Sequence, residues 1–225
     1  MIDRIFYDAD RALKDVTLKM LEPGADSTRF LDCGPGNCAF TGELIQRLGS
    51  KSNYVADSVP SRLGLAQDLG LGIKECDLNR EIPYPCDFFD VIHAGQIIEH
   101  LNDTDGFVEE LYRVTRPGGY CLVSTPNLAS WHNILWLALG KQPHVAMVSD
   151  RIIRWRLGDD EEDEPKHRRV FTGQGLAMLL SYHGFTVEKI RGAGYYPFTG
   201  RVSRVSSTLD RRHAAYVVVK ARRVR

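Results

Sequence analysis

Apolar and polar positions follow two different periods along this chain. Short apolar runs, typical of buried strands, alternate with longer segments in which apolar residues recur every three or four positions, as on one face of a helix. This pattern predicts strands at 28–33, 52–57, 71–77, 88–94 and 119–125 and helices at 3–22, 38–49, 60–69, 103–115 and 128–139. Because strands that alternate with helices form βαβ units, we expect a mostly parallel sheet with helices on both faces.

The alternation stops at residues 140–170, which contain the charged run GDDEEDEPKHRR. A connection of this length is either a lid over a binding site or a surface insertion. Beyond it, Thr172 has the position of an N-cap for a helix at 173–183 that ends at Gly184. The runs FTVEKIRG and HAAYVVVKARR then predict two strands. We predict no helix between them, so the two strands should pair antiparallel.

These segments predict one domain at 1–225, with an N-terminal helix (1–27), a core (28–127), a lid or insertion (128–170) and a C-terminal helix with two strands (171–225). The hydrophobic share of 43% and the charged share of 26% are ordinary for a globular protein. The apolar run ILWLALG is much shorter than the ~20 residues of a membrane span. Because the N-terminus carries charges and no apolar signal core, we expect a cytoplasmic protein.

The cysteines and charges constrain the chemistry further. Five cysteines lie without CxxC spacing, which favours reduced thiols over disulfides or a zinc site. Residues 1–150 contain 13 Lys+Arg and 21 Asp+Glu, a net of −8, whereas residues 151–225 contain 16 and 8, a net of +8. Chance surface composition and two chemically different ligands explain this asymmetry equally well.

The stretch RFLDCGPGNCAF places a glycine-rich turn between the first strand of the predicted sheet and a helix. Glycine tolerates positive φ and has no Cβ, so such a turn lets a ligand approach the backbone. Gly34-x-Gly36-x-x-Ala39 satisfies the loose dinucleotide fingerprint, which would indicate NAD or FAD. However, Asp32 disfavours a neighbouring pyrophosphate, and Pro35 removes an N–H that a phosphate would use. A dinucleotide domain also does not need the final antiparallel strand pair.

S-adenosylmethionine fits this turn better, because it carries an ammonium and a sulfonium in place of phosphates. Asp32 would lie near its methionine end, either in contact with it or by holding the loop. Asp57 ends the second strand and is placed to accept hydrogen bonds from the ribose hydroxyls. Asp77 ends the third and can accept from the adenine amino group, while Leu78 offers an apolar contact. A single acid of this kind is often only a turn former, but three at successive strand ends favour a shared ligand.

Five motifs lie between residues 29 and 127, namely LDCGPGNCAFT, VADSVPSRL, ECDL, FFDVIHAGQIIEHL and LYRVTRPGGYCLVSTPN. They resemble those of class I S-adenosylmethionine-dependent methyltransferases, in the broad group that contains the quinone-biosynthesis enzymes. The resemblance implies a Rossmann-like seven-stranded sheet whose last strand is antiparallel, and backbone around Ala94 and Gly95 that meets the methionine end of the cofactor. Cys38 departs from the pattern, since the family often has a third glycine there. Tyr7 either covers the cofactor, as aromatic residues do in similar enzymes, or packs in the core.

Methyl transfer from a sulfonium is an in-line displacement, and it needs a base only if the nucleophile carries a proton. Three histidines follow the fifth predicted strand: His132, His144 and His167. His132 is best placed for a general base, because ligands of open α/β sheets bind beyond the carboxyl ends of the strands. His167 is the second catalytic candidate, and with Arg168 and Arg169 it can instead clamp an anionic group.

The acceptor is expected to be a small molecule. Trp131, Trp136 and Trp155 indicate an apolar pocket for an aromatic or lipid-like group, and the basic C-terminal third permits an anionic substituent. Glu99 and His100 are too few to hold a metal, so we expect a structural role for them and no metal. The sequence carries no stacked-aromatic RNA signature. O-methylation of a small molecule is therefore preferred over N-methylation of an amine, RNA methylation, an NAD(P)-dependent oxidoreductase or a non-catalytic partner subunit.

Overall fold

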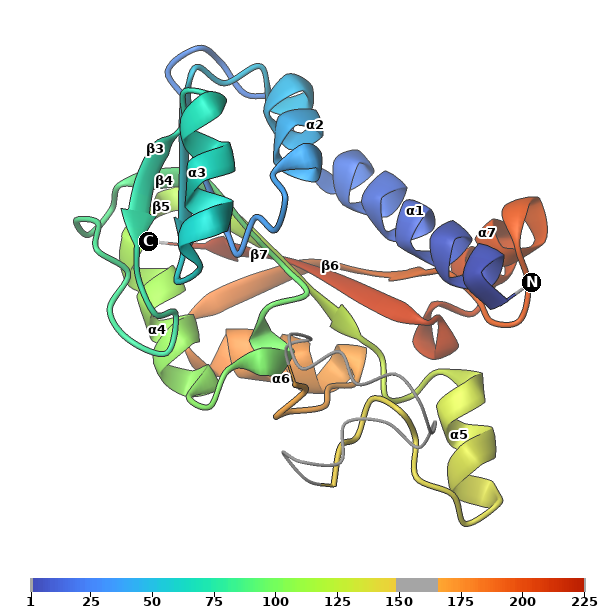
Figure 1. Ribbon diagram of the computed structural model, residues 1–225. Coiled ribbons are helices and arrows are strands. Elements are labelled where there is room, and N and C mark those ends of the chain that lie inside the picture. Colours follow the sequence, from blue (N-terminus) through green and yellow to red (C-terminus); the bar gives the residue numbers. More distant parts are fainter. Residues whose placement is uncertain (1, 149–165, 225) are drawn as a thin grey trace.

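The computed structural model describes residues 2–148 and 166–224 (Figure 1). Seven strands from these residues form one sheet in the order β3-β2-β1-β4-β5-β7-β6. β1 to β5 are parallel, and β7 runs antiparallel to both of its neighbours, β5 and β6. The predicted fold class, a Rossmann-like seven-stranded sheet with an antiparallel last strand, is confirmed. The strands are β1 (Arg29–Cys33), β2 (Ser52–Asp57), β3 (Gly72–Glu75), β4 (Phe89–Gly95), β5 (Thr115–Pro126), β6 (Phe185–Ala193) and β7 (Tyr216–Arg223).

Helices cover both faces of the sheet, with α1, α2 and α3 on one face and α4 and α6 on the other (Figure 1). α5 projects beyond the end of β5. None of the helices in the described parts of the chain is long and apolar enough to cross a bilayer. The helices are α1 (Ile2–Met20), α2 (Ala39–Leu48), α3 (Pro60–Asp68), α4 (Thr104–Val114), α5 (Trp131–Ala138), α6 (Gly173–Tyr182) and α7 (Gly200–Leu209), with 3₁₀ turns η1 (Ile98–His100) and η2 (Arg211–His213).

Two apolar cores explain why the parallel strands are continuous apolar runs. Phe30 of β1 belongs to the core that α1 and α2 complete, whereas its neighbour Leu31 belongs to the core that α4 and α6 complete. Both side chains are fully buried, because successive residues of a strand point to opposite faces of a sheet that helices cover on both sides. Each such side chain contributes about 1.5–3 kcal/mol through burial.

Most predicted elements are confirmed to within a few residues, and the exceptions have local causes. β3 ends at Glu75, so Asp77 lies in the loop beyond the strand and does not end it. Thr172 caps α6 as predicted, with its side chain accepting from the N–H of Gly175 at 3.0 Å. β6 and β7 are antiparallel as predicted, but the reason given was wrong, because α7 lies between them.

Part of the predicted lid or insertion, residues 149–165, falls outside the described residues. Trp155 and the acidic part of the charged run lie in this gap, whereas the last four residues of the run, 166–169, are described. Its described flanks are α5 on one side and residues 166–170 on the other. The lid hypothesis therefore stays a prediction.

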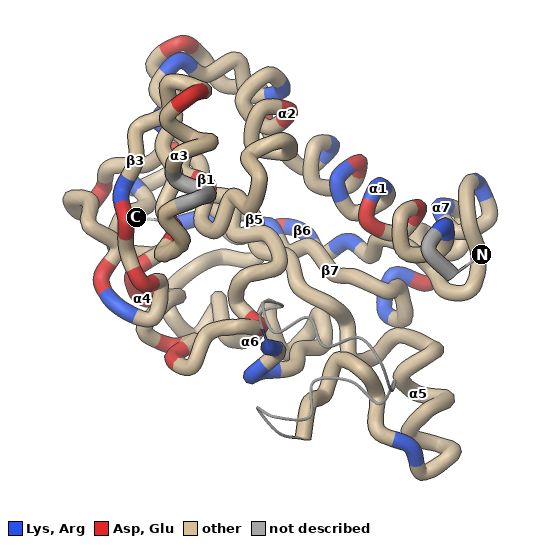
Figure 2. Tube along the Cα trace, viewed as in Figure 1, with Lys and Arg blue, Asp and Glu red and all other residues tan. Residues whose placement is uncertain are grey.

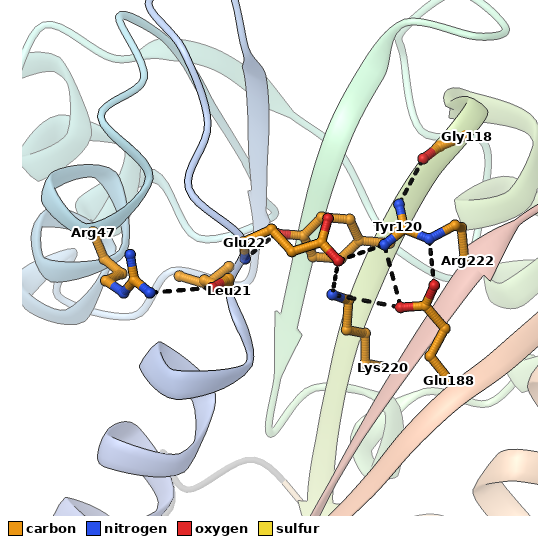
Figure 3. Close-up of polar contacts among 8 residues, drawn as sticks. All are labelled: Leu21, Glu22, Arg47, Gly118, Tyr120, Glu188, Lys220 and Arg222. Atoms are coloured by element: carbon orange, nitrogen blue, oxygen red, sulfur yellow. Dashed lines mark hydrogen bonds and ion pairs between the residues drawn. The ribbon is translucent and has the colours of Figure 1, made fainter.

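A buried lysine connects the N-terminal helix to the last strands of the sheet (Figure 3). Lys220 of β7 is only 1% exposed, and its ammonium pairs with Glu22, just after α1, and lies 3.5 Å from Glu188 of β6. The ring of Tyr120 lies 4.3 Å below the ammonium, and Arg222 contacts both carboxylates. A charge this deep is stable only when it is paired. The network therefore fixes the segment that follows α1 against β6 and β7.

Lys220→Met should lower the free energy of unfolding by about 2 kcal/mol at pH 7, because it leaves two carboxylates with one cation fewer. Burial alone would raise the pKa of Glu22, but Lys220 and Arg222 lower it, and Arg222 lowers the pKa of Glu188. Carboxylates with depressed pKa values stabilise the fold above their unfolded value, and this stability is lost as the pH falls through the folded value. The variant should therefore lose less stability than the parent on acidification below about pH 4.5.

Urea unfolding at several pH values measures both effects. Lys51→Met is the matched control, because Lys51 pairs with Asp26 and its side chain is 75% exposed. An exposed pair of this kind contributes at most about 1 kcal/mol. Equal losses in the two variants would show that the buried network does not anchor α1.

Candidate active site

The predicted site residues gather at one edge of the sheet. Because β1, β2 and β4 are parallel neighbours, their carboxyl ends and the loops that follow them lie side by side. A hollow lined by Gly42, Lys51 and Leu69 lies at the amino ends of β2 and β3 and so belongs to the opposite edge. The predicted residues at or just beyond the carboxyl ends are Asp32, Gly34, Gly36, Asp57, Asp77, Leu78, Ala94 and Gly95.

Asp32 lies beneath the glycine turn and is 3% exposed. One carboxylate oxygen accepts a hydrogen bond from the Thr41 hydroxyl of α2 at 2.6 Å. The other lies 2.8 Å from Nδ1 of His93, its register partner on β4. Because a carboxylate accepts only, Nδ1 carries the hydrogen in this contact. Of the two roles predicted for Asp32, this geometry favours holding the loop.

The turn itself has three residues in the left-handed region. Gly34 and Gly36 have φ values of 69° and 56°, and Cys38, at the N-cap of α2, has φ of 60°. A Cβ on Gly34 would lie 2.8 Å from Cδ1 of Ile97, whereas a Cβ on Gly36 would meet nothing within 4 Å. Gly36 therefore borders open space in which a ligand can approach the backbone. Cys38 therefore adopts a conformation that glycine tolerates more readily than residues with a side chain.

The two other predicted acids differ in their surroundings. Asp57 is 3% exposed and ends β2, where it accepts a hydrogen bond from the N–H of Val59 at 2.9 Å. Asp77 is more exposed and accepts from the N–H and side-chain amide of Asn79, which lower its pKa. Leu78 beside it is buried, with 5% exposure. Of these two acids, Asp57 is therefore the more firmly fixed.

The end of β4 brings backbone close to the turn. Ala94 is fully buried, and a Cβ on Gly95 would lie 2.6 Å from the ring of His93, so only glycine fits there. The next residue, Gln96, has φ of 54° and is held by hydrogen bonds to the backbone and hydroxyl of Ser124. β4 therefore ends in a tightly fixed turn that faces the same edge.

Aromatic side chains gather beyond β5 and β6. The ring of His132 on α5 lies 4.8 Å from that of Tyr196, which also contacts Phe6 of α1 at 5.5 Å. The Tyr196 hydroxyl lies 3.4 Å from the Tyr216 hydroxyl. Tyr7 is 64% exposed, which rules out the predicted alternative that it packs in the core. These rings come from four separate segments and provide one wall beside the end of the sheet.

His132 and His167, the two predicted catalytic residues, lie in different surroundings. Burial, with a smaller effect of His144, lowers the pKa of His132 to about 4, so its ring is neutral at physiological pH and can accept a proton. It is a weak base, because general bases work best with pKa values near the working pH. The ring centroid of His167 lies 5.1 Å from that of His100.

His167 changes the interpretation of Glu99 and His100. Glu99 and His100 are adjacent in the sequence, and two residues are too few to hold a metal. The fold adds a third, because one potential ligand atom of each of Glu99, His100 and His167 lies within 4.8 Å of the others. Glu99 is 2% exposed, and burial raises the pKa of its carboxyl to about 7. The structural role expected for this pair stays a prediction.

Sequence reasoning missed His93 and Thr41, which hold Asp32. His93 was hidden in an apolar strand, and only the strand register places it opposite Asp32. Thr41 lies nine residues after Asp32, where α2 folds back over the strand. A polar residue inside a buried strand was the one available signal, because such a group needs a partner.

Asp32→Ala should lower the free energy of unfolding by about 3–5 kcal/mol, because it leaves the buried Thr41 hydroxyl and His93 ring without their acceptor. Thr41→Val removes one of these donors and should cost about 1 kcal/mol. Chemical denaturation of the parent and both variants measures the difference. Equal, small losses would show that the Asp32 carboxylate does not hold the loop.

Comparison with known proteins identifies the family of the chain. Residues 5–190 match the family described as a methyltransferase domain. The chain is 25% identical over 208 residues to the mitochondrial ubiquinone biosynthesis O-methyltransferase of Rattus norvegicus, covering 88% of this chain and 55% of that protein. It is 26% identical over 148 residues to the malonyl-[acyl-carrier protein] O-methyltransferase of Halorhodospira halophila, covering 63% of this chain and 50% of that protein.

A solved structure shows the same fold. The S-adenosylmethionine-dependent methyltransferase of Mesorhizobium loti superposes with a TM-score of 0.63 at 19% identity, covering 96% of this chain and all of that one. The chain spans about half the length of the two curated relatives above. The family match does not support the NAD(P)-dependent alternative. The chain belongs to the class I S-adenosylmethionine-dependent methyltransferases, whose methyl donor is S-adenosylmethionine.

Proposed function

We propose that this protein transfers the methyl group of S-adenosylmethionine to a hydroxyl oxygen of a small molecule. The observation that carries the proposal is the arrangement of one sheet edge. Strand ends supply a rigid glycine turn and buried acids, and an aromatic wall of His132, Tyr196 and Phe6 lies beyond the neighbouring strands. A cofactor held on the first group would present its methyl to an acceptor beside the second.

The cofactor side fits S-adenosylmethionine residue by residue. Gly36 leaves space beside the backbone for the methionine end, and the turn at Ala94 and Gly95 closes it from β4. Asp57 is assigned to the ribose hydroxyls, since its carboxylate can accept two hydrogen bonds. Asp77 is assigned to the adenine amino group, with the apolar Leu78 beside it. Tyr7 is exposed and available to cover the cofactor.

The acceptor side favours a small aromatic or lipid-like molecule. Both curated relatives described above are named O-methyltransferases, which favours oxygen over nitrogen as the acceptor atom. Basic residues lie along β6 and at α7 (Figure 2), including exposed Arg191, Arg201 and Arg204. These basic residues permit an anionic substituent on the small molecule. They also make RNA the second candidate acceptor, because basic surfaces bind the phosphates of nucleic acids.

His132 is the proposed proton acceptor. Its neutral ring can take the hydroxyl proton as the oxygen attacks the methyl, while the C–S electron pair passes to sulfur. Because its pKa is near 4, it can do so efficiently only for an acceptor hydroxyl that is already acidic or is made so in the site. His167 lies in the segment that follows the gap at 149–165, and it is proposed to act on the acceptor as a second catalytic residue.

Asp57→Asn should weaken the binding of S-adenosylhomocysteine by about 1.5–3 kcal/mol, the range for a hydrogen bond to a charged group. Asparagine keeps the oxygen that accepts from the Val59 N–H, so the melting temperature should change little. Calorimetric titration measures the affinity, with Asp26→Asn as the control, because the exposed Asp26 pairs with Lys51 away from the strand ends. Unchanged affinity in Asp57→Asn, or a collapse of the fold, would contradict the ribose role.

Methyl-tritiated S-adenosylmethionine, incubated with the protein and a fractionated cell extract, tests the proposed acceptor class. We expect the label in small molecules or lipids, with mass spectrometry placing the methyl on oxygen. Asp57→Asn at a limiting cofactor concentration should incorporate less label, which ties the product to this site. Label confined to RNA or protein would overturn the proposal, and a methyl on nitrogen would overturn its O-methyl part.

A further inference from the structure

Three potential metal ligands converge just beyond the end of β4. Glu99 and His100 belong to η1, and His167 follows 67 residues later. One ligand atom from each residue lies within 4.8 Å of the others. Within residues 2–148 and 166–224 this is the one group of three or more His, Cys, Asp or Glu residues that meets this distance. The fold, and not the local sequence, brings the group together.

The segment that carries His167 is fixed to η1 by the backbone. The N–H groups of Arg168 and Arg169 both donate to the carbonyl of Glu99, at 2.7 and 3.1 Å. The guanidinium of Arg169 also donates to the carbonyl of Asn102, at 3.1 Å. His167 is therefore held beside Glu99 without the help of an ion, so the site is largely preformed.

The orientation of His100 suits a metal ligand. Its Nδ1 lies 3.0 Å from the carbonyl oxygen of Lys166. Because a carbonyl only accepts, Nδ1 carries the hydrogen, and the lone pair of the neutral ring is on Nε2. Nε2 lies 4.0 Å from a carboxylate oxygen of Glu99. Metal-binding histidines are oriented in the same way, with the second ring nitrogen donating to a carbonyl or carboxylate.

Glu99 supplies a second, independent observation. It is 2% exposed, and neither carboxylate oxygen makes a hydrogen bond of good geometry among the described residues; the buried Thr125 hydroxyl, which lies nearby, makes none either. A buried carboxylate without a donor is costly, and native structures rarely retain one without a reason. A cation between the carboxylate and the two imidazoles would satisfy it.

We propose that Glu99, His100 and His167 bind one divalent transition-metal ion. Two imidazoles and one carboxylate favour zinc, manganese, iron or cobalt over magnesium and calcium, which prefer oxygen ligands alone. Ligands at about 2.1 Å from one ion lie no more than about 4.2 Å apart, so the observed separation needs only a small closure. Three protein ligands leave at least one position open.

The open position is assigned to the acceptor oxygen, a step that rests on the proposed O-methyltransferase function. One carboxylate leaves a divalent ion with a net charge of +1, which favours an anionic oxygen as the next ligand. A hydroxyl bound there becomes more acidic and releases its proton to water or His132. The oxygen then forms the O–CH₃ bond while the S–CH₃ bond breaks and its electron pair stays on sulfur. A base as weak as His132 suffices for such a hydroxyl.

The site can be tested without cofactor or acceptor. The full chain, stripped with a chelator, is titrated with Zn²⁺, Mn²⁺, Co²⁺ and Mg²⁺ by calorimetry, and Co²⁺ absorption reports the ligand environment. We expect one transition-metal ion per chain, weak Mg²⁺ binding and at least a 100-fold loss of affinity in Glu99→Gln and His167→Asn. His183→Gln is the control, because His183 faces the carboxylates of Asp105 and Glu109 in a pairing outside the convergent group.

Each outcome decides one part of the proposal. Absence of binding, or full binding in both variants, overturns the metal site. His167→Asn remains informative if Glu99→Gln fails to fold, and S-adenosylhomocysteine binding verifies that each variant is folded. Metal binding with methyl transfer unaffected by chelation overturns the assignment of the open position and leaves the site standing. Metal binding with no label in any small molecule overturns the proposed function and leaves the site standing.

Discussion

The structure depends on one buried carboxylate. Asp32 connects three elements, because it lies on β1, binds α2 through Thr41 and faces β4 through His93. The glycine turn that follows it runs directly from strand to helix, with residues in left-handed conformations that cost energy outside glycine. Such a turn keeps its shape only if both of its ends are fixed. Asp32 fixes both ends of the turn through its contacts with Thr41 and His93. It thereby determines where a ligand can approach the backbone of the turn.

The two halves of the site are built in different ways. The proposed cofactor half consists of strand ends and their first loop residues, such as Asp57 and Gly95, which the parallel sheet holds rigidly. The proposed acceptor half comes from α5, the loop at Tyr196 and residues 166–169, which the sheet constrains less. Trp131 and Leu135 on α5 are about half exposed, at 47% and 60%.

Sequence predicted the elements that depend on local pattern. Strand-like runs, the glycine turn and the Thr172 cap are short-range signals, and the structure reproduces them. The sequence did not predict what depends on register or on distant contacts. His93 opposes Asp32 only through strand pairing, and His167 meets Glu99 only after the chain returns to η1. α7 was missed although Val202, Val205 and Leu209 recur at helical spacing, and in the structure this apolar stripe is exposed while Ser203 and Ser207 are buried.

A cysteine in place of the family's glycine shows how the fold constrains the loop. Cys38 takes φ of 60°, a region that side chains disfavour, while its N–H donates to the Pro35 carbonyl and its carbonyl accepts from the Gly42 N–H. Its thiol is buried beside Val55 and Ala66, so packing compensates part of the strain. Backbone hydrogen bonds and burial together therefore hold a residue with a side chain in a conformation that glycine adopts more readily.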